Sequence, residues 1–167
     1  MSLTIGEHIA QHAMLGMGRV GSTTAYSIAK SGVAVTSASG ANGVLATISV
    51  PANYMGLDSQ LVITCDFTSG GAVGTRRITV AINDGSSTNV LVTTMSATAS
   101  RGQFRIAQRG VAASQRNTID WVTSLALAST PASNTTKTLT GAFTVTITAT
   151  NPSDSVTLES YVAVVYP

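Results

Sequence analysis

The sequence predicts an all-β protein, an antiparallel sandwich or barrel of eight or nine short strands. Two observations lead to this prediction. From residue 31 onward, β-branched and aromatic residues recur in short segments, and many of these alternate apolar with polar side chains. Clusters of Gly, Asn, Asp, Pro and Ser separate the segments at regular intervals. The segments show no sequence repeat, which argues against a propeller or a β-helix.

The composition indicates a folded domain with an unusual surface. Of 167 residues, 44% are hydrophobic and only 10% are charged, whereas charged residues make up about a quarter of a typical soluble domain. The hydrophobic content excludes a disordered chain. A net charge of +2 is too weak to indicate nucleic-acid binding. We find neither a membrane-helix pattern nor a secretory signal, and so expect synthesis in a cytosol and no membrane insertion.

Residues 1–30 are expected to form an arm outside a domain of residues 31–167. Thr4 and Glu7 make a capping-box pattern, and the apolar residues near helical spacing beside them are Ile5 and Ile9. We therefore predict a short helix, then a glycine hinge, then a second helical turn near residues 22–30. The domain is expected to fold without the arm.

The hinge contains a G-x-G-x-x-G pattern made by Gly16, Gly18 and Gly21. It resembles the phosphate-binding turn of lactate and malate dehydrogenases. That turn needs a buried strand before it and an acidic residue about 20 positions after it. No Val/Ile run precedes this pattern, and no carboxylate follows until Asp58. We therefore predict a hinge and no nucleotide cofactor.

Nine segments after the arm are predicted strands: 32–37, 44–50, 60–68, 76–82, 89–96, 102–109, 118–127, 142–150 and 156–165. The polar segment 128–140 is predicted to be a loop. In the last strand, the apolar phase is disturbed near residues 159–160. The side chains expected in the core by alternation are Phe104, Ile106, Phe143, Val145 and Ile147.

Residue types that carry catalysis or bind metals are sparse. His8 and His12 would share a helix face, but no third metal ligand accompanies them. Cys65 lies in an apolar strand and is expected to be a buried, inert thiol. The carboxylates are scattered, with Asp58, Asp84 and Asp154 at turns. We predict that the protein is not an enzyme and binds no metal.

The arginines are more informative. Arg101, Arg105, Arg109 and Arg116 fall within sixteen residues. On a regular strand, Arg105 and Arg109 share one face. Arg is enriched at protein interfaces, so we expect these arginines at a subunit boundary, where they would meet carboxylates of a neighbouring copy. The expected carboxylate partners are Asp66 and Asp120. The alternative is a solvated face balanced by distant acidic residues.

Four segments of the C-terminal half are similar to a jelly-roll module of tailed-bacteriophage virion proteins: residues 49–68 (SVPANYMGLDSQLVITCDFT), 77–84 (RITVAIND), 102–115 (GQFRIAQRGVAASQ) and 139–167, with the ending TLESYVAVVYP. The resemblance covers about residues 40–167 and leaves out the arm. It implies a jelly roll in a trimeric, non-enzymatic virion component made in the host bacterial cytoplasm.

Our leading hypothesis is a homotrimeric protein on the virion surface that decorates the capsid. The arm of residues 1–30 would anchor it to the major capsid protein or to another virion protein. The alternative is a tail-associated knob that binds a host receptor or a surface glycan. Against a glycan site, the sequence has one Trp and four Tyr, whereas sugar platforms favour exposed aromatic side chains.

Overall fold

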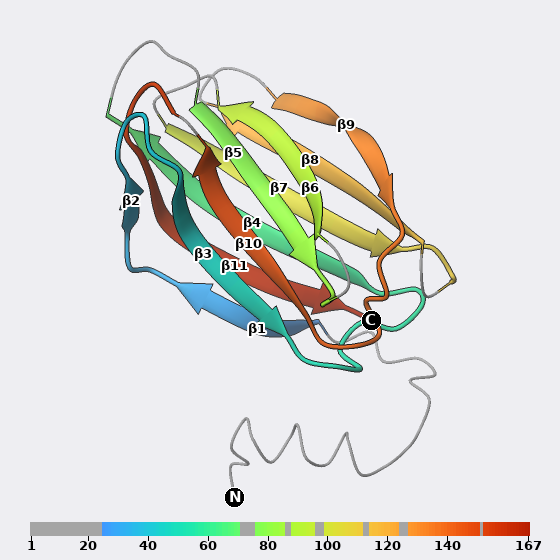
Figure 1. Cartoon of the computed structure of the whole chain (residues 1–167). Helices are drawn as coiled ribbons and strands as arrows, with labels where there is room; N and C mark the ends of the chain where they lie inside the picture. The colour runs from blue at the N-terminus through green and yellow to red at the C-terminus, as the bar shows by residue number, and fades with distance from the viewer. Residues whose placement is uncertain are drawn as a thin grey trace, which may run out of the picture.

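The computed structural model describes residues 25–70, 76–85, 88–95, 99–111, 114–123, 127–150 and 152–167. In these ranges the protein is all-β, with two antiparallel sheets stacked face to face (Figure 1). The strands are β1 (Tyr26–Ser31), β2 (Val35–Ser37), β3 (Gly43–Val50), β4 (Gln60–Ser69), β5 (Arg76–Asn83), β6 (Thr88–Met95), β7 (Ala99–Gln108), β8 (Gln115–Thr123), β9 (Leu127–Thr135), β10 (Phe143–Thr150) and β11 (Val156–Tyr166).

The large sheet has seven strands in the order β1-β11-β4-β7-β8-β9, with β2 also paired to β11. β1 pairs with residues 161–165 of β11, and β2 pairs with residues 156–158 of the same strand. The two short strands therefore act as two halves of one edge. At the other edge, β8 and β9 follow β7 as successive antiparallel neighbours.

The small sheet has four strands in the order β3-β10-β5-β6. β10 lies between β3 and β5, and β6 is joined to β5 by a short connection. Except at that connection and at the β7–β8 and β8–β9 turns, the chain crosses from one sheet to the other each time it leaves β2 or a later strand. Strands distant in sequence thus become neighbours within each sheet.

The core lies between the two sheets and follows the two-residue alternation of the strands. In β10, Phe143, Val145 and Ile147 are buried, while Thr144 and Thr146 between them are half-buried on the outer side. Phe104 and Ile106 of β7 are fully buried. All five side chains predicted for the core are therefore confirmed.

β11 departs from the regular alternation. Its register against β4 shifts between Leu158 and Ser160, where the sequence pattern had indicated a disturbance. The shift moves Val162 to the outer face, where it is 43% exposed, and places Ala163 and Val165 in the core. A bulge of this kind adds one residue to a strand and so reverses the face of the residues that follow.

Two segments differ from the prediction. Residues 26–30 form strand β1 rather than a helical turn, because they add to the free edge of β11. Residues 127–135 form edge strand β9 rather than a loop. Pro131 in this segment argues against a central strand, but an edge strand tolerates proline. It lies where the register of β9 against β8 shifts.

The N-terminal predictions lie largely outside the described residues. These comprise the helix carrying Ile5 and Ile9, the histidines His8 and His12, and the hinge at Gly16, Gly18 and Gly21. In the described ranges, the chain begins next to the large sheet, since Tyr26 opens β1. Five residues of the segment 1–30 therefore take part in the sheet.

Candidate functional site

The predicted arginines lie on the outer face of the large sheet, near one end of β7 and β8. Arg105 is half-buried on β7, and Arg116 is exposed on β8 opposite Ala107. Arg109 is exposed and directly follows β7, and its amide donates to the carbonyl of Ser114 at 3.0 Å. Arg116 is thus a diagonal neighbour of Arg105, at a spacing of roughly 7–8 Å, while Arg109 lies four residues beyond Arg105 along the chain.

None of these three arginines forms an ion pair with a described residue. Arg105 Nη2 donates to Gln103 Oε1 at 3.2 Å, whereas its buried Nε has no hydrogen-bond partner among the described residues. The three arginines therefore lie near one end of β7 and β8, and none forms an ion pair with a described carboxylate. We call Arg105, Arg109 and Arg116 the arginine triangle.

Arg101 and Asp66, which the sequence predicts at a subunit boundary, form an ion pair within one chain. They are cross-strand neighbours on β7 and β4, and Arg101 Nε lies 2.7 Å from Asp66 Oδ1 in the same chain. The Ser160 hydroxyl also donates to Asp66 at 3.0 Å. The hydrogen bond from Arg101 is the main cause that holds the pKa of Asp66 below its usual value. Asp66 is therefore already paired within its own subunit.

The second expected partner, Asp120, lies opposite Gln103 on the same outer face and is half-buried. It shares a cross-strand row with Gln103, while Asp66 shares the adjacent row with Arg101. The structure thus places the two carboxylates on neighbouring rows but not together. Asp120 forms no ion pair with a residue in the described ranges.

Cys65 lies beside Asp66 in β4 with its side chain directed into the core. It is 0% exposed. Burial, with a smaller contribution from the charge of Asp66, raises the pKa of its thiol far above the ordinary value. Because the thiolate is the reactive form, the thiol is inert, as the sequence predicted.

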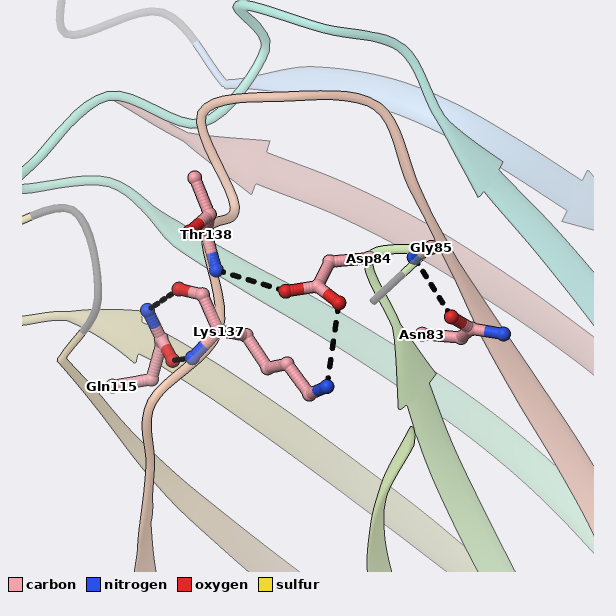
Figure 2. A network of polar contacts seen from close by, with 6 residues as sticks. All are labelled: Asn83, Asp84, Gly85, Gln115, Lys137 and Thr138. Carbon is pink, nitrogen blue, oxygen red and sulfur yellow. Dashed lines mark hydrogen bonds and ion pairs between the residues drawn. The ribbon is translucent and has the colours of Figure 1, made fainter. Parts of the chain in front are cut away.

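A buried polar network that the sequence did not predict occupies the end of the sandwich near the β5–β6 connection (Figure 2). Lys137 Nζ lies 3.3 Å from Asp84 Oδ1, with side-chain exposures of 1% and 6%. The amide of Thr138 donates to Asp84 Oδ2 at 3.2 Å. Asp84 thus joins the turn after β5 to the segment between β9 and β10.

The side chain of Gln115 forms two hydrogen bonds with the backbone of Lys137. Its Oε1 accepts the Lys137 amide at 2.7 Å, and its Nε2 donates to the Lys137 carbonyl at 2.5 Å (Figure 2). The same Nε2 lies 2.7 Å from Gln108 Oε1 across the β7–β8 pair. The network therefore runs from the large sheet, through Lys137, to the small sheet. No sequence signal links residues 53 positions apart, such as Lys137 and Asp84.

A third ion pair closes the opposite end of the sandwich. Arg76 opens β5, and its Nη2 lies 3.3 Å from Asp154 Oδ2 in the β10–β11 turn, with side-chain exposures of 2% and 22%. The turn before β3 joins the same region, since the Gly40 amide donates to the Pro152 carbonyl at 2.7 Å. Of the three aspartates predicted at turns, Asp84 and Asp154 therefore form ion pairs with buried basic side chains.

A shallow, open depression of about 440 Å³ lies beside the Lys137–Asp84 pair. It is lined by residues 49–51, 83–85 and 142–144 at the ends of β3, β5 and β10. Both carboxylate oxygens of Asp84 are engaged by Lys137 and Thr138, and Asn83 Oδ1 accepts the Gly85 amide at 2.8 Å. The polar side chains that line the depression are Ser49, Asn83, Asp84 and Thr144.

Across β3, β10 and β5, the outer face of the small sheet carries mostly small uncharged side chains, with exposed Arg77 opposite Thr150 at one end. Cross-strand pairing sets its side chains in three rows, each of which crosses β3, β10 and β5. We call this surface the threonine face; its rows are Val44–Thr148–Thr79, Thr47–Thr146–Ala81 and Ser49–Thr144–Asn83. All nine residues are half-buried or exposed and none is charged.

The described ranges contain no cluster of three or more His, Cys, Asp or Glu side chains that could hold a metal ion. The same ranges contain no helix that is long and apolar enough to span a membrane.

Comparison with protein-family models, curated proteins and solved structures gives no match.

Proposed function

We propose that the protein is a structural component of a bacteriophage virion, and specifically a trimeric protein that decorates the capsid. The segment preceding β1 would anchor it to the major capsid protein or to another virion protein. The proposal combines the resemblance of residues 40–167 to phage virion modules with one structural observation, the order of the strands in the two sheets.

The strand order supports a jelly roll. With β1 and β2 taken as one interrupted strand, the order β1-β11-β4-β7 faces β3-β10-β5-β6. Each sheet then has four strands, and the chain alternates between sheets as two Greek keys require. Double-sheet jelly rolls of eight strands recur in viral capsid proteins. The hairpin of β8 and β9 is an addition next to β7 that widens one sheet.

The buried polar contacts suit a protein that must persist on a particle. Lys137–Asp84 and Arg76–Asp154 tie turns together at opposite ends of the sandwich. Loop ends with satisfied backbone groups open less readily than free loops, and local opening is what proteases exploit. This supports a structural role, because both ion pairs join connections between strands.

The decisive experiment locates the protein on purified particles. Cryo-electron microscopy of phage whose genome encodes the chain should reveal density for the two-sheet domain on the capsid surface, in groups of three. Particles lacking the gene should lose this density. Density at the tail would favour the receptor- or glycan-binding alternative. If the protein is missing from purified particles by mass spectrometry, the virion role is wrong.

A further inference from the structure

We propose that Lys137 and Asp84 are the site of a covalent modification, an amide bond that forms between their side chains with loss of one water molecule. The bond ties the segment between β9 and β10 to the turn after β5 within one chain. The inference goes beyond the proposed virion function, because it concerns the chemistry of the chain and does not depend on where the protein acts.

The cation of this pair differs chemically from the cations of the other ion pairs in the described ranges. The pair at the opposite end of the sandwich and the pair on the large sheet both use arginine, and a guanidinium group keeps its proton in a protein. The Lys137 side chain ends in an amine, which becomes a nucleophile once it loses a proton. Lys137 and Asp84 thus bring together the two functional groups that condense to an amide.

Both reacting groups lie where water is largely excluded. The side chains of Lys137 and Asp84 are 1% and 6% exposed, and Lys137 Nζ lies 3.3 Å from Asp84 Oδ1 (Figure 2). Transfer of one proton from the ammonium group to the carboxylate removes both charges, and burial favours uncharged forms. A neutral amine beside a neutral carboxylic acid is the combination that reacts to form an amide.

Hydrogen bonds hold both reactants in position. The Gln115 side chain accepts the Lys137 amide at 2.7 Å and donates to the Lys137 carbonyl at 2.5 Å. On the other reactant, the Thr138 amide donates to Asp84 Oδ2 at 3.2 Å, while Oδ1 faces the amine. Well-oriented groups within one molecule reach effective concentrations of about 10⁵–10⁸ M, which favours condensation over hydrolysis.

The reaction is a condensation in which atoms and charges balance. One proton passes from Lys137 Nζ to Asp84 Oδ1, and the amine nitrogen then attacks Cγ. As the bond from Nζ to Cγ forms, negative charge develops on Oδ2, to which the Thr138 amide donates. A second proton passes from Nζ to Oδ1, the Cγ–Oδ1 bond breaks, and Oδ1 leaves as water. The ammonium and the carboxylate thereby become one neutral amide and one water molecule, without an oxidant or a reductant.

The surroundings of Asp84 favour release of the water and retention of the bond. Asp84 lines the open depression at the ends of β3, β5 and β10, so water released there lies next to solvent. The amide also removes the cost of keeping two charges away from water. The product joins residues 53 positions apart, and a cross-link that closes a long loop restricts the unfolded chain, as a disulfide does.

The test is mass spectrometry of the denatured full chain, whose two lysines are Lys30 and Lys137. We expect a mass below that of the sequence by one water molecule. Trypsin should fail to cut after Lys137, and residues 78–101, which contain Asp84, should appear joined to residues 117–167 in one branched peptide. Lys137→Arg should restore the full mass and release residues 78–101 as a separate peptide. The matched control Lys30→Arg, at an exposed lysine of β1, should keep the link.

The inference is wrong if the wild type has its full mass and trypsin releases residues 78–101 and 117–137 as separate peptides. A loss of water that persists in Lys137→Arg would also refute it, because that loss would indicate a cyclic imide at the bond between Asp84 and Gly85. Circular dichroism verifies that each variant folds. If Lys137→Arg does not fold, the branched peptide of the wild type alone decides the question. Location on particles is measured separately, so failure of the virion role is distinguishable from failure of this inference.

Discussion

At the scale of single residues, the same kind of ion pair has different consequences at different depths. Lys137 and Asp84 are almost fully buried, whereas Arg101 and Asp66 have side-chain exposures of 62% and 39%. Removing one member of a buried pair leaves a charge without solvent or partner, which is costly. An exposed pair is screened by water and contributes little. Burial therefore decides which pair holds the fold.

We expect Lys137→Met to lower the free energy of unfolding by about 3–5 kcal/mol, because it leaves the Asp84 carboxylate buried without its cation. Urea unfolding measures the loss. The matched control is Arg101→Met, which should change the midpoint only slightly. The double variant Lys137→Met/Asp84→Asn should recover part of the stability. Equal losses in the two single variants would contradict the distinction between buried and exposed pairs.

The Asp66–Arg101 pair has a testable pH dependence. Arg101 holds the pKa of Asp66 below its usual value in the folded state. Asp66 therefore stabilises the fold above its unfolded pKa of about 3.9, and the contribution is lost as the pH falls through the lowered folded value. Carboxyl titration by NMR should show the Asp66 pKa rising toward normal in Arg101→Gln. An unchanged pKa would refute the assigned cause.

At the scale of elements, the sequence predicted nine strands to within a few residues and failed where tertiary pairing decides the structure. Alternation and turn residues were sufficient for β10, whose inward and outward side chains follow the sequence pattern. They were insufficient for β1 and β9, because a short or proline-containing segment becomes a strand only when an edge is present to pair with it.

The contacts of the candidate sites also differ in how far the sequence alone predicts them. Strand parity predicted one face for Arg105 and Arg109, but β7 ends at Gln108, so Arg109 directly follows the strand, and the position of Arg116 opposite Ala107 depends on the β7–β8 pairing. The Asp66–Arg101 pair within one chain could not, because it depends on β4 being placed beside β7. The Lys137–Asp84 pair depends on two connections at one end of the sandwich. Such contacts carry no local sequence signal.

The burial of β10 gives a prediction about core packing. Phe143 is 3% exposed, so Phe143→Ala should lower the free energy of unfolding by about 3–5 kcal/mol through lost contacts and an unfilled cavity. The neighbouring change Thr144→Ala, on the outer side, should cost less than about 1 kcal/mol. Chemical denaturation of both variants provides the comparison, and a larger loss for Thr144→Ala would mean that the strand faces are reversed.

The passage from β2 to β3 brings the two sheets together at close range. A Cβ atom added at Gly43 would collide with the side chain of Ser37, which is buried at 4% exposure. We therefore expect Gly43→Ala to lower the thermal unfolding midpoint. Ser37→Gly added to it should restore part of the loss, because most of the colliding atoms are removed. No recovery in the double variant would show that the strain lies elsewhere.

At the scale of the whole molecule, the charge distribution and the buried networks have separate roles. Ion pairs at both ends of the sandwich tie the connections between strands, while the two outer faces differ in charge. Among the described side chains, the outer face of the large sheet carries both acidic and basic residues, whereas β3, β10 and β5 present only Arg77 as an outward charge.

The position of the domain boundary follows from the pairing of β1. The sequence predicted that a chain starting near Ser31 would fold alone, but Tyr26–Ser31 pairs with β11, and Ile28 and Ala29 pack against the core. A chain of residues 25–167 should therefore melt at the temperature of the full chain. A chain of residues 32–167 should melt lower, since it leaves the β11 edge unpaired and removes apolar contacts. Differential scanning calorimetry of the three chains tests this. If residues 32–167 melt like the full chain, β1 adds nothing to the domain, and the boundary predicted from the sequence is the better one.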